Sequence, residues 1–136
     1  MLEENTLTYE EYIDIIGSIG WKYPSKRLLE LSLKNSMTVK YKIEEKTVGM
    51  ARLVTDNGYI ALVADVIVKP EYQGQGIGKK MIENLLFRAK ETLEEGEAMM
   101  IQLLAADGKM EFYKKFGFKD KIEVVEAGMY MWFNKN

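Results

Sequence analysis

One short segment of the chain combines three glycines with a following run of helix-forming residues, a pattern that suits phosphate binding. The segment reads Gln73-Gly74-Gln75-Gly76-Ile77-Gly78-Lys79-Lys80. Glycine removes side chains from a turn, so backbone N–H groups can approach a ligand closely. The first N–H groups of a helix lack partners and lie at the positive end of the helix dipole, where they attract anions. The sequence therefore predicts a phosphate-binding turn followed by a helix.

Three phosphate-binding patterns compete for this segment. A P-loop, G-x-x-x-x-G-K-[ST], fails at its first glycine and at its last residue. A dinucleotide-binding fingerprint, G-x-G-x-x-G, fits Gly74 and Gly76 but fails at Lys79. The pattern Q/R-x-x-G-x-G/A fits Gln73, Gly76 and Gly78 in full. A glycine-rich turn that binds nothing is the structural alternative.

A single acidic residue interrupts the apolar run just before this segment. Asp65 lies within the stretch Tyr59–Val68, which is otherwise apolar almost throughout. Burying a carboxylate is costly unless it is paired, and functional sites often contain such groups. Asp65 is therefore a candidate catalytic base. The alternative is a structural aspartate that binds free backbone N–H groups.

The composition limits the chemistry that is available. The 136 residues include no cysteine and no histidine, so catalysis must use other side chains, backbone groups or water. No carboxylate cluster has metal-ligand spacing, so we expect no metal. An apolar fraction of 47%, a charged fraction of 29% and a net charge of −2 indicate one globular domain, residues 1–136, that binds neither nucleic acid nor membrane. Without a signal-peptide or membrane-spanning pattern, we expect a cytoplasmic protein.

Periodicity and turn residues predict an α/β domain. A capping-box pattern at Thr8 starts a first helix that ends at Gly20, and Ser25 caps a second helix. The remaining predicted elements follow in order: strands at 37–43, 47–54 and 59–68, a helix at 77–93, a strand at 98–104, a helix at 107–116 and a strand at 128–133. The apolar strand at 59–68 should be covered on both faces. This order predicts antiparallel pairing first and a βαβ unit later.

The chain resembles the GNAT superfamily of acyl-CoA-dependent N-acyltransferases, including its small bacterial members. The segment 66–80 is similar to the family's acyl-CoA signature, and Phe112–Phe118 is similar to its later tyrosine-bearing motif. The resemblance covers residues 8–133. It implies a mixed, mostly antiparallel central sheet with helices on both faces and a splayed pair of strands at the acyl-CoA site. The family's first strand would shrink to about Asn5–Leu7 or be absent.

The resemblance also assigns a donor site. The backbone of Val66, Ile67 and Val68 would line the pantetheine arm, and an N–H group near Val66 would polarise the thioester carbonyl. Amide groups from Gln73 to Lys79 would hold the pyrophosphate, and the lysines that open the helix, Lys80 included, would add positive charge. Ordinary solvated lysines are the alternative.

Three aromatic residues complete the implied site. Tyr113 would be the general acid that protonates the departing thiolate, since a phenol is protonated at neutral pH. The alternative is that Tyr113 packs against Phe112 and Phe116. Trp21 and Tyr23, in the loop between the first two helices, would wall the acceptor pocket. Their alternative role is packing between those helices.

The resemblance therefore implies an N-acetyltransferase that moves an acetyl group from acetyl-CoA to a primary amine by direct attack in a ternary complex. The acceptor is a small-molecule or peptide amine, and the protein is a monomer or a homodimer. A non-catalytic acyl-CoA sensor or partner-binding module is one alternative. A dinucleotide-binding oxidoreductase is another, which the mismatch at Lys79 argues against.

Overall fold

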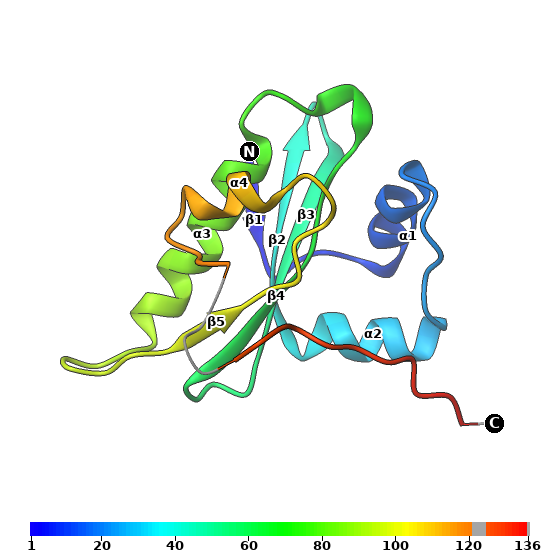
Figure 1. Ribbon diagram of the computed structural model, residues 1–136. Helices are drawn as coiled ribbons and strands as arrows, with labels where there is room; N and C mark the ends of the chain where they lie inside the picture. The colour runs from blue at the N-terminus through cyan, green and yellow to red at the C-terminus, as the bar shows by residue number, and fades with distance from the viewer. Residues whose placement is uncertain (121–124, 136) are drawn as a thin grey trace. The chain divides into compact units, whose positions relative to one another are not determined.

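The computed structural model describes residues 1–120 and 125–135. The chain forms two compact units, Met1–Leu103 and Leu104–Asn136. The first unit contains a five-stranded sheet with helices on both of its faces (Figure 1). The expectation of one domain over residues 1–136 stays a prediction. Within the described residues, no helix combines the length and the apolar character needed to cross a membrane.

The strands lie in the sheet in their chain order. They are β1 (Leu2–Glu4), β2 (Ser36–Ile43), β3 (Lys46–Thr55), β4 (Ile60–Val68) and β5 (Met100–Gln102). Pairing from β1 to β4 is antiparallel, whereas β4 and β5 are parallel. A helix, α3 (Ile77–Glu91), connects the two parallel strands. The mixed sheet and the late βαβ unit confirm the predicted fold class.

Helices cover the two faces of the sheet separately. The first two helices, α1 (Tyr9–Ser18) and α2 (Lys26–Lys34), lie on one face, and α3 lies on the other (Figure 1). Apolar side chains from the first two helices, the segment before α1, β3 and β4 form a buried core cluster, comprising Leu7, Tyr12, Ile15, Ile16, Leu29, Met50 and Ile67. The predicted stripe of α3 contributes Met81, Ile82, Leu85 and Ala89, all of which are buried.

Both predicted N-terminal caps are present. The Thr8 hydroxyl accepts a hydrogen bond from the Glu11 backbone N–H at 3.1 Å. The Ser25 hydroxyl accepts one from the Leu28 N–H at 3.3 Å. Gly20, with a φ of 76°, follows the end of α1 as predicted. These local signals fix where the two helices begin and where the first one ends.

Four sequence predictions in the first unit need correction. The first strand is Leu2–Glu4, not 5–7, because Asn5 has a left-handed φ of 55° and turns the chain. β5 has only three residues, fewer than predicted, and α3 ends at Glu91, two residues early. The start of β4 is not covered on both faces, since Ile60 and Leu62 are 42% and 41% exposed. Of the β4 residues, the core cluster described above includes Ile67, near the end of the strand.

The second unit contains a short helix, α4 (Met110–Lys114). Its start is later than predicted because Gly108 has a φ of 78° and forms a turn. Gly117, with a φ of 99°, follows the helix as expected. The predicted strand at 128–133 is wrong, because these residues have no strand conformation. Met129 and Trp132 are 92% and 86% exposed, and an extended segment without ladder partners does not form a stable strand.

Candidate functional site

A bulge interrupts the centre of β4. The pairing of β3 with β4 shifts its register between Met50 and Arg52. As a result, Asp65 and Val66 both stand opposite Ala51. Asp65 has a φ of 55°, a left-handed conformation that costs about 1 kcal/mol for a residue with a side chain. Such bulges bend a strand and change the direction of its backbone groups.

The outer edge of β4 is open beyond its first three residues. Pairing with β5 ends at Leu62, and no other strand in the described part of the chain pairs with that edge. Lys69 donates its N–H to the Val48 carbonyl of β3 at 2.8 Å. Because alternate residues of a strand face the same neighbour, Val66 and Val68 direct their backbone groups to the open edge. The edge of β4 beyond Leu62 is therefore open, and the splayed pair of strands stays a prediction.

Ile67 lies between these two residues but faces the other way. Its side chain belongs to the core cluster beneath the sheet and is 6% exposed. By the same alternation, its backbone groups face β3. Ile67 thus packs in the core and does not present its backbone groups to the open edge. The sequence prediction had placed Ile67 in the donor site together with Val66 and Val68.

The glycine turn joins this edge to α3. Gly74 and Gly76 both have a φ of 81°, and the space around each is open within 4 Å, so conformation rather than crowding favours glycine. Gly76 is the N-cap of α3, and the first turn contains no acidic residue. The N–H groups of Ile77, Gly78 and Lys79 therefore lack the side-chain cap that starts α1 and α2. They lie at the positive end of the helix dipole.

Close packing fixes α3 against β3 at this point. A Cβ atom at Gly49 would lie 3.2 Å from both Ile77 Cγ2 and Met81 Cε. The absence of a side chain at Gly49 lets the first turn of α3 approach the sheet. Gly49 also pairs with Val68 across β3 and β4. The position of the helix N-terminus and the position of the open strand edge thus both depend on packing at Gly49.

The two lysines of the first helical turn are exposed. Lys79 Nζ lies 3.8 Å from Glu83 Oε1, an exposed i,i+4 pair. Lys80 Nζ lies 5.6 Å from the centroid of the Tyr41 ring. Exposed pairs of this kind are weak, so both ammonium groups can turn toward an anion at the helix N-terminus.

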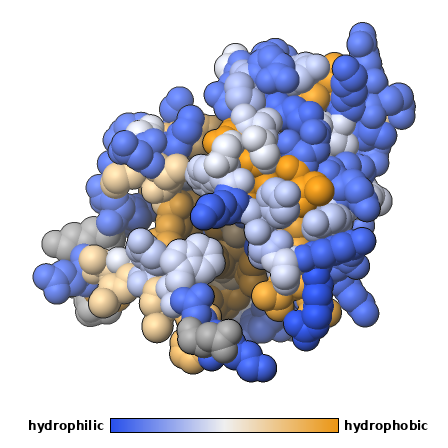
Figure 2. All heavy atoms as spheres, turned by 90° about the vertical axis from the view of Figure 1, so that its right-hand side faces the viewer, coloured by the Kyte–Doolittle hydropathy of each residue, from blue (hydrophilic) through white to orange (hydrophobic). Residues whose placement is uncertain are grey.

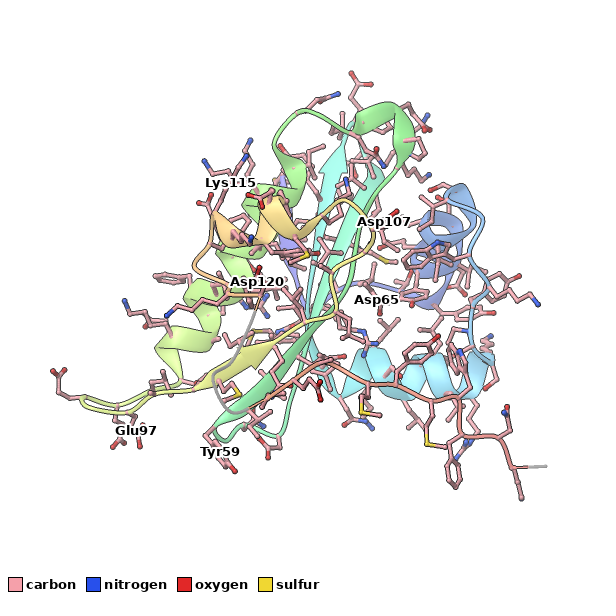
Figure 3. All side chains as sticks on the ribbon, viewed as in Figure 1. Tyr59, Asp65, Glu97, Asp107, Lys115 and Asp120 are labelled. Atoms are coloured by element: carbon pink, nitrogen blue, oxygen red, sulfur yellow. The ribbon has the colours of Figure 1, made fainter. Side chains whose placement is uncertain are left out.

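The side chains of Asp65, Arg52 and Tyr12 form a polar cluster at the bulge, on the side of the sheet that faces α1. Asp65 points to that side of the sheet (Figure 3). Arg52 Nε donates to Asp65 Oδ2 at 2.8 Å, and the two side chains are 16% and 18% exposed. The pKa of the Tyr12 hydroxyl is raised above its ordinary value, mainly by burial. The negative charge of Asp65 and a hydrogen bond to Asp65 raise the pKa further. The aspartate predicted from the sequence is therefore one member of a cluster with Arg52 and Tyr12.

The sequence analysis missed the other two members of this cluster. Tyr12 fitted the apolar spacing of the first helix, and 3% exposure confirms that its ring is buried. Arg52 stands among apolar residues of β3, as Asp65 does in β4. Two opposite charges in two adjacent apolar strands were the signal that would have indicated a pair.

The loop between α1 and α2 contains the two aromatic residues predicted to wall the acceptor pocket. Trp21 and Tyr23 are each 53% exposed, so neither is a core residue of the helix pair. On α2, Leu28 and Leu31 are also exposed, by 51% and 43%. Figure 2 views the molecule from the side of these helices, where apolar residues appear between polar ones. This part of the surface can contact an apolar group.

The second unit places Tyr113 in a small aromatic group. Its ring makes edge contacts with Phe112 and Phe118, with ring centroids 5.1 Å and 6.0 Å apart. Burial raises the pKa of the Tyr113 hydroxyl above its ordinary value, so the proton is retained through the neutral range. Among the residues that the structure describes, no three acidic side chains gather as metal ligands would.

Comparison with known proteins assigns the family. A family model for the acetyltransferase (GNAT) domain matches residues 34–120. The chain is 37% identical over 114 residues to the uncharacterized N-acetyltransferase ycf52 of Pyropia yezoensis, covering 79% of this chain and 63% of that protein. A GNAT-family acetyltransferase structure from Streptococcus pneumoniae superposes with a TM-score of 0.79 at 26% identity, covering 100% and 98% of the two chains. The chain belongs to the GNAT acetyltransferase family.

Two further comparisons define how far this similarity extends. The chain spans less than two thirds of the length of the first curated relatives that it matches, between 55% and 63% for three of them. A GNAT-family acetyltransferase from Elizabethkingia anophelis, solved with acetyl-CoA bound, shares the fold with a TM-score of 0.65 and 18% identity, covering 88% of this chain and 75% of that one.

Proposed function

We propose that this domain is an N-acetyltransferase that transfers an acetyl group from acetyl-CoA to a primary amine. The observation that carries the proposal is the open outer edge of β4 beside the uncapped N-terminus of α3. An extended arm can pair with the edge as an added strand. A pyrophosphate can bind the free N–H groups of the helix. Coenzyme A contains both parts, in a single connected molecule.

The donor would lie along β4 and end at the bulge. The backbone groups of Val66 and Val68 would bind the pantetheine arm. The amide groups from Gln73 to Lys79 would bind the pyrophosphate, with Lys80 adding charge. The Val66 N–H group would stabilise the negative charge that develops on the thioester oxygen. Family membership and the fold shared with the acetyl-CoA-bound acetyltransferase from Elizabethkingia anophelis support acetyl-CoA as the donor.

The reaction would proceed by direct attack. The neutral amine nitrogen forms a bond to the thioester carbonyl carbon while the carbon–sulfur bond breaks, and the amine proton passes to water. The family resemblance assigns Tyr113 as the group that would give its proton to the departing thiolate and regain one from solvent. The absence of cysteine from the chain is consistent with a path that lacks an acyl-cysteine intermediate.

The acceptor amine would enter from the side of α1 and α2. Trp21 and Tyr23 are exposed aromatic residues that can contact an amine or its apolar chain. Replacing Trp21 with Ala should raise KM for the amine and leave Kd for acetyl-CoA unchanged. The matched control is Tyr59→Phe, at an exposed tyrosine in the turn before β4.

Turnover tests the proposal. Purified protein is mixed with acetyl-CoA and a panel of primary amines that includes a polyamine, a peptide with a free α-amine and a lysine-containing peptide. Free thiol and acetylated product are measured together. Equal amounts of both products with one class of amine would support the proposal. Acetyl-CoA binding without acetylation of any amine would contradict the transferase assignment.

A further inference from the structure

We propose that Arg52, Asp65 and Tyr12 form a clamp that holds the bulge of β4 in the conformation that binds acetyl-CoA. Arg52 and Tyr12 are then positioning residues that act through the bulge and do not touch the coenzyme. We refer to these three residues as the bulge clamp. The inference rests on the proposed function, because it concerns the same donor site.

The bulge clamp connects three elements of the first unit. Arg52 lies on β3 and donates to Asp65 Oδ2 at 2.8 Å from Nε and to Ser36 Oγ at 3.3 Å from Nη1. Tyr12 comes from α1, and its hydroxyl lies beside the Asp65 carboxylate. Asp65 on β4 is therefore approached by Arg52 from β3 and by Tyr12 from α1, and Arg52 also contacts Ser36 at the start of β2.

A second contact joins α1 to the residue that follows β4. Lys69 Nζ lies 2.5 Å from Asp14 Oδ2 on α1. Because the Asp14 side chain is 62% exposed, this ion pair is weak. The Lys69 N–H also donates to the Val48 carbonyl of β3 at 2.8 Å, so the end of the strand is held by β3, and the restraint at the bulge comes from the bulge clamp.

The conformation of Asp65 explains why such a clamp is needed. Its φ of 55° is unfavourable for a residue with a Cβ atom. Residues in strained conformations persist where surrounding contacts over-determine them, and they gather at functional sites. Without the clamp, Asp65 can relax to an extended conformation, which changes the direction in which the next residue, Val66, presents its N–H group.

This role also accounts for the chemistry of Asp65. The sequence indicated either a catalytic base or a carboxylate that binds backbone N–H groups. In the structure one carboxylate oxygen accepts from Arg52, and the Tyr12 hydroxyl lies near the group. The Arg52 guanidinium binds Asp65 Oδ2 and pairs with its negative charge. We therefore assign Asp65 to positioning and leave amine deprotonation to water.

The test compares two charge-removing variants in the full chain. Arg52→Gln removes the cation of the bulge clamp. Glu11→Gln is the matched control, because it breaks the Lys40–Glu11 pair, which spans 2.9 Å between β2 and α1 and has similar burial. Acetyl-CoA Kd is measured by calorimetry, and unfolding by urea is measured for each protein. Loss of the cation should lower the fraction of the protein whose β4 bulge has the conformation that binds acetyl-CoA. The apparent Kd should therefore rise about tenfold in Arg52→Gln and stay within about twofold of the parent value in Glu11→Gln.

A glycine variant supplies the rescue. Glycine adopts a positive φ without strain, so Asp65→Gly should keep the bulge even when the clamp is absent. The double variant Arg52→Gln/Asp65→Gly should therefore bind acetyl-CoA within about threefold of the parent, a non-additive result that identifies a shared role. If Arg52→Gln does not fold, Tyr12→Phe replaces it in the test, because that variant removes only the Tyr12 hydroxyl from the bulge clamp.

Three results would overturn the inference. Arg52→Gln and Tyr12→Phe could bind acetyl-CoA as tightly as Glu11→Gln does. The double variant could remain as weak as Arg52→Gln. Asp65→Gly could bind acetyl-CoA normally and lose turnover, which would place the carboxylate in the chemistry.

If the parent itself does not bind acetyl-CoA, the proposed function fails and the clamp is tested by hydrogen exchange alone. The Ile67 amide should then exchange faster in Arg52→Gln than in Glu11→Gln. Equal exchange rates would overturn the clamp without any reference to the coenzyme.

Discussion

The Gln73 side chain donates a hydrogen bond from Nε2 to the Val68 carbonyl oxygen, over 2.9 Å. This bond joins the first residue of the glycine turn to the open edge of β4. The two halves of the proposed donor site, the strand edge and the helix N-terminus, are therefore connected through one exposed side chain. Their relative position depends on that contact as well as on the packing of Gly49 against α3.

Replacing Gln73 with Ala should weaken acetyl-CoA binding by about fivefold, because a net hydrogen bond contributes about 1 kcal/mol and here it orders the site. The free energy of unfolding should change little, since Gln73 is exposed. Calorimetry and urea unfolding measure the two quantities. The control is Gln102→Ala, another glutamine on the protein surface. Equal Kd values for the two variants would show that the Gln73–Val68 bond has no part in binding.

Replacing Gly76 with Ala should destabilise the protein by about 1 kcal/mol, because the left-handed φ of 81° is unfavourable for alanine. No atom lies within 4 Å of the added Cβ, so the loss comes from the backbone alone. Gly17→Ala is the matched control inside α1, where the space is also open and φ is not positive. That change should stabilise the protein by about 0.5 kcal/mol or more. Chemical unfolding of both variants should give opposite signs, and the same sign would contradict the assigned geometry.

Replacing Tyr113 with Phe should lower kcat by about a hundredfold or more, the usual contribution of a general acid. Kd for acetyl-CoA should stay unchanged. Burial raises the pKa of Tyr113, so its proton should remain available at neutral pH, and any loss of activity from its ionisation should appear only above pH 10. Phe112→Leu, which alters an adjacent ring, is the control for packing. An unchanged kcat in Tyr113→Phe would remove it from the mechanism.

Tyr12 should make stability depend on alkaline pH. An unfolded tyrosine has a pKa near 10, and burial and Asp65 raise the pKa of Tyr12 in the folded protein. The unfolded chain then releases this proton first, so the stabilisation is complete below pH 10 and is lost as pH rises toward the folded pKa. Tyr12→Phe should therefore lose stability less steeply than the parent between pH 9 and 11. Parallel curves from urea unfolding would contradict this linkage.

The sequence predicted those features of the fold that depend on local signals. The caps at Thr8 and Ser25, the turn at Gly20 and the stripe of α3 were found where the residue types placed them. The order of the helices and strands from α1 to α4 was also predicted. The glycine turn was predicted because a left-handed turn before a helix requires glycine at defined positions.

The remaining features depend on contacts between distant residues. The strand predicted at 128–133 has suitable residues but no strand conformation, because strand formation requires a ladder partner that periodicity does not supply. The Arg52–Asp65 pair joins two strands whose register includes a bulge, and a single sequence does not reveal which charges become neighbours. Tyr12 showed only an apolar pattern, although its hydroxyl lies in the same cluster.

The most direct test of the donor site is a titration of the isotope-labelled protein with acetyl-CoA, followed by backbone amide NMR. The largest shifts should occur at two separate segments, Val66–Val68 and Gly74–Lys79, with NAD as the control ligand. Shifts at both segments with acetyl-CoA alone would place the pantetheine arm on β4 and the pyrophosphate on α3. An absence of shifts at millimolar acetyl-CoA, or shifts confined to other residues, would contradict the proposed function.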